Sequence, residues 1–180
     1  EAGLDRLFDY IQRHTDPILT KTAVAHLEFE ALHPFQDGNG RIGRMLITLM
    51  LWSSQTISAP HFYISGYLEE HKNRYIDLMR SVSQTGDWNA WVVFFLKAIE
   101  SQSIRNLAIA ENIRQLYEEM KQRFSEVLSS KHAMSVLDFV FTYPVFRNSS
   151  LSEITGISTA TANRFTKALH EEGILIMTQE

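Results

Sequence analysis

Apolar residues recur every three or four positions through most of the chain, a spacing that is typical of α-helices. The pattern predicts helices over residues 4–11, 18–32, 42–52, 68–82, 88–104 and 103–128. The 42–52 helix is apolar nearly all round, as expected of a central buried helix. A short aromatic segment at 62–64 fits either a strand or a loop. The sequence therefore predicts a mainly α-helical fold.

The two long helices differ in the width of their apolar faces. Residues 88–104 carry an aromatic stripe, which indicates core packing and consists of Trp88, Trp91, Val92 and Phe95. Residues 103–128 carry one narrow apolar seam among charged positions, formed by Ile109, Ile113, Leu116, Met120, Phe124 and Leu128. Such a seam suits a connector helix or the contact of a homodimer.

The last fifty residues predict a small domain of their own. Helices are expected over 133–141 and 151–154, and a third helix runs from its cap at Ser158 to about Glu172. Residues 174–176 then predict a strand. This order is typical of a winged helix whose second wing strand is missing. We therefore expect three parts: a helical core at 1–104, a connector helix at 105–131 and a winged-helix domain at 132–180.

The composition limits the partners that the chain can have. Its 180 residues carry a net charge of −4, so no general basic field draws it to nucleic acid or to an anionic membrane. Without cysteine the chain forms neither disulfides nor thiolate metal sites, which suits a cytoplasmic protein. Residues 45–68 lack charged side chains, but polar residues and a proline interrupt them, so we expect a buried helix and a loop instead of a membrane span. No signal peptide is visible, and a first residue other than Met suggests that upstream elements are absent.

The segment HPFQDGNGRIGR, residues 33–44, separates two predicted helices. Glycines at a helix N-terminus let backbone N–H groups converge on one anion, and the helix end adds partial positive charge. Gly38-Asn39-Gly40 supplies these glycines. Arg41 and Arg44 lie three residues apart, so their side chains share a helix face. Two guanidinium groups beside such a glycine loop favour a polyphosphate as the ligand.

Two further side chains of this segment supply reactive chemistry. Asp37 can ligate the Mg²⁺ that accompanies a nucleoside triphosphate. His33 is the group that can take a proton near neutral pH. A base, a metal carboxylate, an anion-binding loop and phosphate-binding arginines are what phosphoryl or nucleotidyl transfer to a hydroxyl requires. The residues therefore predict a nucleoside triphosphate and Mg²⁺ as ligands.

A glycine turn with only a structural role is the competing interpretation of this segment. It is not a Walker A motif, because it lacks G-x-x-x-x-G-K-[ST] and follows a helix instead of a strand. The close spacing of His33, Asp37 and the two arginines favours a site. We expect His26, seven residues before His33, to be a hydrogen-bonded structural residue that orients the loop. No histidine pair has zinc-binding spacing with a supporting carboxylate, so no zinc site is predicted.

The 33–44 segment resembles the signature of the Fic family, H-x-F-x-[D/E]-G-N-G-R-x-x-R, at every defined position. The resemblance covers roughly residues 4–104, and a winged helix behind such a core is a combination seen in many bacterial Fic proteins. It implies an all-helical enzyme that binds ATP and Mg²⁺. Such enzymes move AMP onto a Ser, Thr or Tyr hydroxyl of a protein, which can be the enzyme itself, and release pyrophosphate.

The resemblance also implies a role for each residue of the segment. His33 is the base that deprotonates the target hydroxyl, Asp37 ligates Mg²⁺, and Phe35 packs under the loop. The phosphates are bound by Gly38, Asn39, Gly40, Arg41 and Arg44. Tyr75 corresponds to the first residue of a Tyr-Tyr pair near the adenosine, whereas Ile76 departs from that pair. The Doc branch, which phosphorylates its target, has lysine in place of Gly40, so the resemblance favours AMP transfer.

Two parts that the resemblance leads one to expect are missing from this sequence. No strand-turn-strand precedes His33 to form the flap that pairs with a target segment, so this chain alone is expected to position a target hydroxyl poorly. The inhibitory pattern [S/T]-x-x-x-E-[G/N] is absent too, and if it lies upstream the longer protein is autoinhibited. Removal of AMP, or another phosphate-containing transfer, stays open as an alternative reaction.

A DNA-binding regulator is the alternative from a different functional class. The third helix of the predicted winged helix offers Asn163, Arg164 and Lys167 as contacts with DNA or with a protein partner. From residue 132 onward, however, three basic residues face five acidic ones. Because DNA affinity depends heavily on phosphate neutralisation, this balance argues against DNA.

Overall fold

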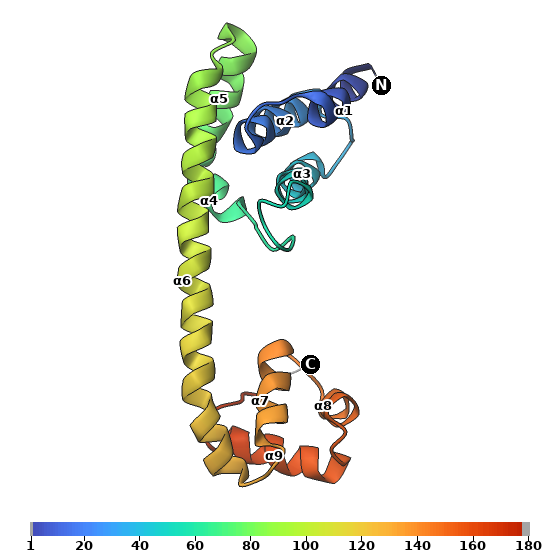
Figure 1. The fold of residues 1–180 in the computed structure, drawn as a ribbon, viewed down its shortest axis with the longest axis vertical. Coiled ribbons are helices and arrows are strands. Elements are labelled where there is room, and N and C mark those ends of the chain that lie inside the picture. Colours follow the sequence, from blue (N-terminus) through green and yellow to red (C-terminus); the bar gives the residue numbers. More distant parts are fainter. Residues whose placement is uncertain (1, 178–180) are drawn as a thin grey trace. The chain divides into compact units, whose positions relative to one another are not determined.

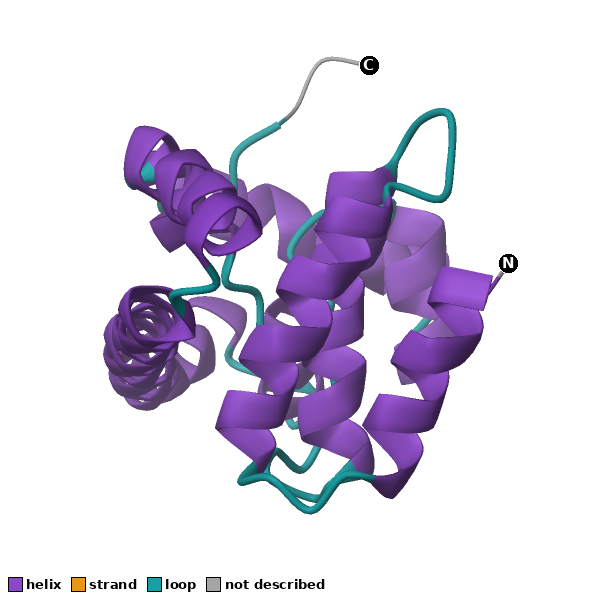
Figure 2. Ribbon diagram, turned by 90° about the horizontal axis from the view of Figure 1, so that it is seen from above, coloured by secondary structure: helices purple, strands orange, loops and turns teal. Residues whose placement is uncertain are grey.

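The computed structural model describes residues 2–177. Helices joined by loops make up this part of the chain, and no strand occurs in it (Figure 2). The helices are α1 (Ala2–Arg13), α2 (Ile18–Leu32), α3 (Asn39–Ser53), α4 (Ser65–Glu70), α5 (Lys72–Thr85), α6 (Trp88–Leu128), α7 (Ala133–Thr142), α8 (Asn148–Thr155) and α9 (Thr159–Glu171). The predicted mainly α-helical fold is confirmed.

The chain divides into two compact units, Glu1–Ala108 and Ile109–Glu180, which we call unit 1 and unit 2. Figure 1 shows the helices in chain order, with α1 to α5 in unit 1 and α7 to α9 in unit 2. Helix α6 contributes its first half to unit 1 and its second half to unit 2.

Two aromatic residues of α6 form the centre of the unit 1 core. Trp91 and Phe95 are fully buried and pack with apolar residues of α2 and α3. The Trp91 indole N–H donates a hydrogen bond of 2.9 Å to the Ala23 carbonyl, so the ring buries its polar group at no loss of hydrogen bonding. The aromatic stripe predicted from sequence is thus core packing, and it fixes α2 against α6.

Helices α2 and α3 form the frame that carries the 33–44 segment. The observed bounds of α2 agree with the predicted range of 18–32. Helix α3 begins at Asn39, three residues before the predicted start, so the first turn of the helix includes Gly40. A second small core, formed by Leu7, Ala25, Phe29 and Met50, packs α1 and α3 on α2. The two ends of the segment are therefore held by packed helices.

Unit 2 has its own core, built around Phe124 of α6 and Phe165 of α9. Ser158 caps α9 as predicted, since its hydroxyl accepts a hydrogen bond of 3.3 Å from the Thr161 N–H. Gly156 ends α8 with φ of 70°, in the left-handed region that favours glycine.

The predicted strand at 174–176 is wrong. The N–H groups of Ile174 and Leu175 both donate to the Leu169 carbonyl, so this segment closes the end of α9 as a turn. A strand requires a neighbouring strand for its backbone groups, and the described residues contain none. The winged-helix assignment of this domain stays a prediction, without the first wing strand that was expected at 174–176.

Two further helix boundaries differ from those predicted. Residues 88–128 form one helix where two were expected, since neither glycine nor proline interrupts them. The single helix expected over 68–82 is divided at His71 into α4 and α5. Residues 62–64 form a loop, tied to α3 where the Thr48 hydroxyl donates to the Phe62 carbonyl. None of the described helices combines the length and apolar character that a membrane crossing requires.

Candidate active site

His33 stands at the C-terminal end of α2 in an uncommon backbone conformation. Its φ of 43° and ψ of 55° are left-handed, and its N–H donates to the Phe29 carbonyl at 3.1 Å. This geometry ends the helix before Pro34, a residue that disfavours helix in the residue ahead of it. The imidazole is exposed, so it is accessible to a reacting group.

The side chain of Asn39 closes the loop between α2 and α3. Its oxygen accepts a hydrogen bond of 2.9 Å from the Phe35 N–H, and its NH₂ group donates one of 2.6 Å to the Phe35 carbonyl. Asn39 is 2% exposed, so these two bonds are shielded from water. The Phe35 ring is 47% exposed and contacts Phe29 at a centroid distance of 6.4 Å. The loop is thus fixed mainly through the Phe35 backbone.

The N-terminus of α3 presents backbone donors that remain unused. Gly38 precedes the helix with φ of 83°, and its own N–H donates to the Asp37 carboxylate at 2.7 Å. The N–H groups of Asn39, Gly40 and Arg41 have no acceptor among the residues that the structure describes. Three free donors at a helix N-terminus attract an anion, because they add to the partial positive charge of the helix end.

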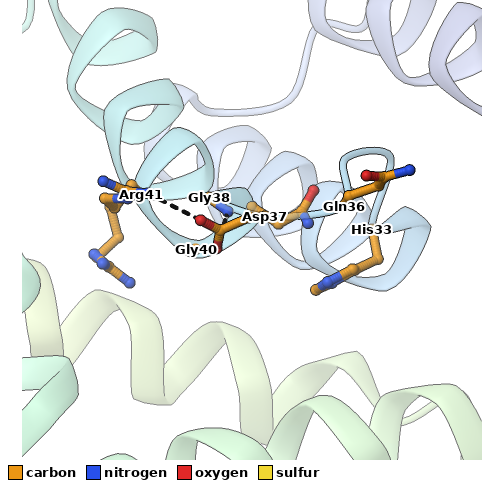
Figure 3. A pocket seen from close by; sticks show the side chains of 8 residues that line it. His33, Gln36, Asp37, Gly38, Gly40 and Arg41 are labelled. Atoms are coloured by element: carbon orange, nitrogen blue, oxygen red, sulfur yellow. Dashed lines mark hydrogen bonds and ion pairs between the residues drawn. The ribbon is translucent and has the colours of Figure 1, made fainter.

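These donors face a pocket of about 310 Å³. It is lined by His33, Gln36, Asp37, Gly38, Asn39, Gly40, Arg41 and Arg44. Figure 3 shows the Asp37 carboxylate between His33 on one side and Arg41 on the other. The pocket thus brings together His33 and all the residues to which the sequence assigned metal or phosphate binding.

The two arginines of the pocket differ in their surroundings. Arg41 is well exposed and lies 3.5 Å from the Asp37 carboxylate, a surface pair of little strength. Arg44 is half-buried and makes no ion pair or hydrogen bond within the described part of the chain. Both guanidinium groups therefore remain available to an anion.

Beneath the pocket, the fully buried His26 joins three helices. Its Nδ1 lies 3.0 Å from the Gly43 carbonyl oxygen in α3, and its Nε2 lies 3.0 Å from the Tyr75 hydroxyl in α5. Since a carbonyl only accepts, Nδ1 carries the proton and Nε2 accepts from the Tyr75 hydroxyl. Burial lowers the pKa of His26 to about 4, which keeps the ring neutral. His26 is thus buried and hydrogen-bonded as expected, and its role in orienting the loop stays a prediction.

Tyr75, a candidate for nucleoside contact, therefore uses its hydroxyl inside the protein. Burial raises the pKa of this hydroxyl, and the nearby Glu30 raises it further, so Tyr75 stays a proton donor to His26. Tyr75 does not line the pocket formed by the 33–44 segment. Its ring is half-buried against Trp91 and Phe94.

Glu30 is a residue of this region that the motif did not reveal. One of its carboxylate oxygens, Oε1, is buried and has no hydrogen-bond partner in the described residues. Burial raises the pKa of this carboxyl, and the positive charges of Arg44 and then His33 act in the opposite direction. Helical spacing is the sequence signal that could have revealed Glu30, because Glu30 lies four residues after His26 on the same face of α2.

The residues fit a magnesium ion only in part. The Asp37 carboxylate is 94% exposed at the pocket and offers the hard oxygen ligand that Mg²⁺ prefers. No group of three or more His, Cys, Asp or Glu side chains with metal-binding geometry occurs in the described residues. One carboxylate suits an ion that takes most of its ligands from phosphate and water, as Mg²⁺ commonly does.

The candidate contacts of unit 2 lie on the surface of α9. The Asn163 side-chain oxygen accepts from Asn148 at 2.8 Å, and the Arg164 guanidinium lies 5.4 Å from the Phe165 ring centroid. Lys167 lies 3.8 Å from the Glu171 carboxylate. All three side chains thus have partners within unit 2.

Comparison with known proteins agrees with this geometry. Residues 1–51, which include the whole 33–44 segment, match the model of the Fic/DOC family. Residues 1–51 are thus similar to the Fic/DOC family. All residues that line the pocket described above lie within this matched range.

Several proteins that are similar to this chain are named protein adenylyltransferases. A probable protein adenylyltransferase of Aquifex aeolicus is 27% identical over 118 residues, 57% of this chain and 37% of its own length. The proteins named protein adenylyltransferase Fic from Aedes aegypti and Culex quinquefasciatus are each 32% identical over 78 residues, 43% of this chain. The chain spans only 14% of the length of these two insect proteins.

Proposed function

We propose that this protein is a protein adenylyltransferase, which transfers AMP from ATP to a Ser, Thr or Tyr hydroxyl of a protein and releases pyrophosphate. The observation that carries the proposal is the shared pocket of His33, the free N–H groups of the α3 N-terminus and two arginines. The names of the relatives support the same activity.

In the proposed reaction, His33 accepts the proton of the target hydroxyl. The hydroxyl oxygen forms a bond to the α-phosphorus, and the bond from that phosphorus to the bridging oxygen breaks. Pyrophosphate leaves with the bonding electrons. The α3 N–H groups, Arg41 and Arg44 bind the charge that develops on the β- and γ-phosphates.

Two residues of the loop support this assignment. Asp37 would hold Mg²⁺, whose charge neutralises the triphosphate when the ion is bound. Gly40 leaves space on the helix surface near Arg44, since a Cβ there would lie 3.1 Å from Arg44 Nη1. With the β- and γ-phosphates in this part of the pocket, the α-phosphate faces the target hydroxyl, which favours nucleotidyl over phosphoryl transfer.

Mass spectrometry of intact protein tests the proposal. The protein is incubated with ATP and Mg²⁺, alone and with candidate target proteins, and each chain is weighed. We expect an added AMP group, on a target or on the protein itself, that is absent with His33→Ala while ATP binding is kept. Modification that persists at the wild-type rate in His33→Ala contradicts the role of His33.

A further inference from the structure

Glu30 lies close to a residue of the proposed phosphate site, since a Cβ on Gly40 would lie 4.0 Å from Glu30 Oε1. It belongs to α2, four residues after His26, so the two side chains share one face of the helix. This face packs against α3, where the His26 ring donates to the Gly43 carbonyl. The carboxyl group is thus held between the two helices that frame the 33–44 segment.

The absence of a side chain at Gly43 makes room for this carboxyl. A Cβ atom on Gly43 would lie 2.3 Å from Glu30 Oε1 and 3.2 Å from a ring carbon of Phe29. The same Oε1 is shielded from water and unbonded. A buried charged oxygen without a hydrogen bond is unfavourable, and burial raises the pKa of this carboxyl; a nearby positive charge favours its ionised form.

Arg44 is the cation that can supply this compensation. A Cβ atom on Gly40 would lie 3.1 Å from Arg44 Nη1 and 4.0 Å from Glu30 Oε1, so the two groups approach the same point of α3. Arg44 lines the pocket, whereas Glu30 is not among the described residues that line it. The guanidinium therefore has the pocket on one side and the carboxyl on the other.

We propose that Glu30 is a positioning residue for Arg44: its carboxylate, whose Oε1 is buried near the same point of α3, orients the guanidinium toward the pocket by its charge, without a direct ion pair, before a phosphate binds. A charge fixed at low dielectric orients a neighbouring cation strongly, and such pre-organisation favours binding. The carboxylate also repels phosphate, but Arg44 lies nearer to the pocket, so its orientation has the larger effect. The inference rests on the proposed function for the identity of the ligand.

A double-mutant cycle without nucleotide tests the pair itself. Thermal unfolding is measured for the wild type, Glu30→Gln, Arg44→Gln and the double variant; the glutamine at 30 keeps the volume beside Gly43 and removes the charge. We expect the double variant to be clearly more stable than the sum of the single changes predicts. Additive changes overturn the inference, whatever the nucleotide measurements show.

Calorimetric titration with ATP and Mg²⁺ tests the consequence for binding. Glu30→Gln is expected to weaken the affinity on the order of 10-fold, as loss of an orienting partner commonly does. Glu28→Gln removes the same charge from another face of α2, and its affinity is expected to equal that of the wild type. Equal or tighter binding by Glu30→Gln overturns the inference. A wild-type protein that does not bind ATP contradicts the proposed function. The double-mutant cycle in thermal unfolding still shows whether Glu30 and Arg44 interact.

Discussion

The Nδ1 atom of His26 lies 3.0 Å from the carbonyl oxygen of Gly43, inside a fully buried environment. With the Tyr75 hydroxyl on its other nitrogen, this one neutral ring joins α2, α3 and α5. The peptide of Gly43 belongs to the helix that presents Arg41 and Arg44. The bond therefore fixes the side of the pocket proposed to bind phosphate relative to α2, the helix that His33 follows.

A pH dependence of stability follows from the buried ring. The pKa of His26 falls from its ordinary value of 6.5 to about 4 on folding, so between these values only the unfolded chain binds the proton. Its contribution is fully present above pH 6.5 and is lost as the pH falls to 4, by about 3 kcal/mol at most.

Chemical unfolding of the wild type and of His26→Gln, measured across that pH range, checks this contribution. The variant is expected to be less stable at neutral pH and to lose less stability on acidification. His61→Gln, which removes an exposed imidazole, serves as the control and should follow the wild type. If the unfolding free energy of His26→Gln falls with pH as steeply as that of the wild type, the lowered pKa of His26 is not the cause of the pH dependence.

Alanine at Gly43 should disturb the contact between α2 and α3. The added Cβ displaces the Glu30 carboxyl, and overpacking of this kind costs about 1–3 kcal/mol of unfolding free energy. Gly66→Ala is the matched control in α4, because the nearest atom to its Cβ lies at 3.5 Å. We expect it to be neutral or to stabilise by up to about 1 kcal/mol, since alanine is the better helix former. Thermal unfolding compares the two, and equal effects contradict the prediction.

Asn39 should control the shape of the loop through its two bonds to Phe35. Asn39→Ala removes both and is expected to reduce stability by about 1–3 kcal/mol and to weaken ATP binding. Asn39→Asp keeps an acceptor for the Phe35 N–H but loses the donor to the Phe35 carbonyl, so it should not restore the wild type. Asn73→Ala, at an exposed position of α5, is the control. Thermal unfolding and titration with ATP provide the readouts. Stability and ATP affinity of Asn39→Ala equal to those of the wild type would show that Asn39 does not control the loop.

The sequence predicted the helices and the loop well because both depend on local patterns. The bounds of α2 follow from apolar spacing and from Pro34, and the cap of α9 follows from Ser158. The 33–44 segment contains its own glycines and charges, so the residues that line the pocket could be named in advance, except for Gln36.

Features that depend on packing between distant segments could not be predicted. The bond from Tyr75 to His26 joins residues 49 positions apart, and the place of Glu30 depends on how closely α3 approaches at Gly43. The strand expected at 174–176 has the right composition, but its backbone bonds to Leu169. The apolar pattern predicts one helix over 68–82 and contains no signal for its division at His71 into α4 and α5.

Asp37 should determine the effect of magnesium on nucleotide binding. Asp37→Asn keeps an oxygen that can accept from the Gly38 N–H and removes the anionic ligand. We expect ATP affinity with Mg²⁺ to fall in the variant, while affinity measured in excess chelator stays equal to that of the wild type. Titrations under both conditions make the comparison. If Mg²⁺ raises the ATP affinity of the wild type and of Asp37→Asn by the same factor, Asp37 is not a magnesium ligand.

The central claim is that the pocket transfers AMP, and the origin of the transferred phosphorus tests it most directly. The protein is incubated with Mg²⁺ and ATP labelled at either the α- or the γ-phosphate, and proteins are separated on a denaturing gel. The account predicts protein-bound label from the α position only, reduced about 100-fold or more by His33→Ala. Label retained from the γ position and not from the α position would identify phosphoryl transfer and contradict the account.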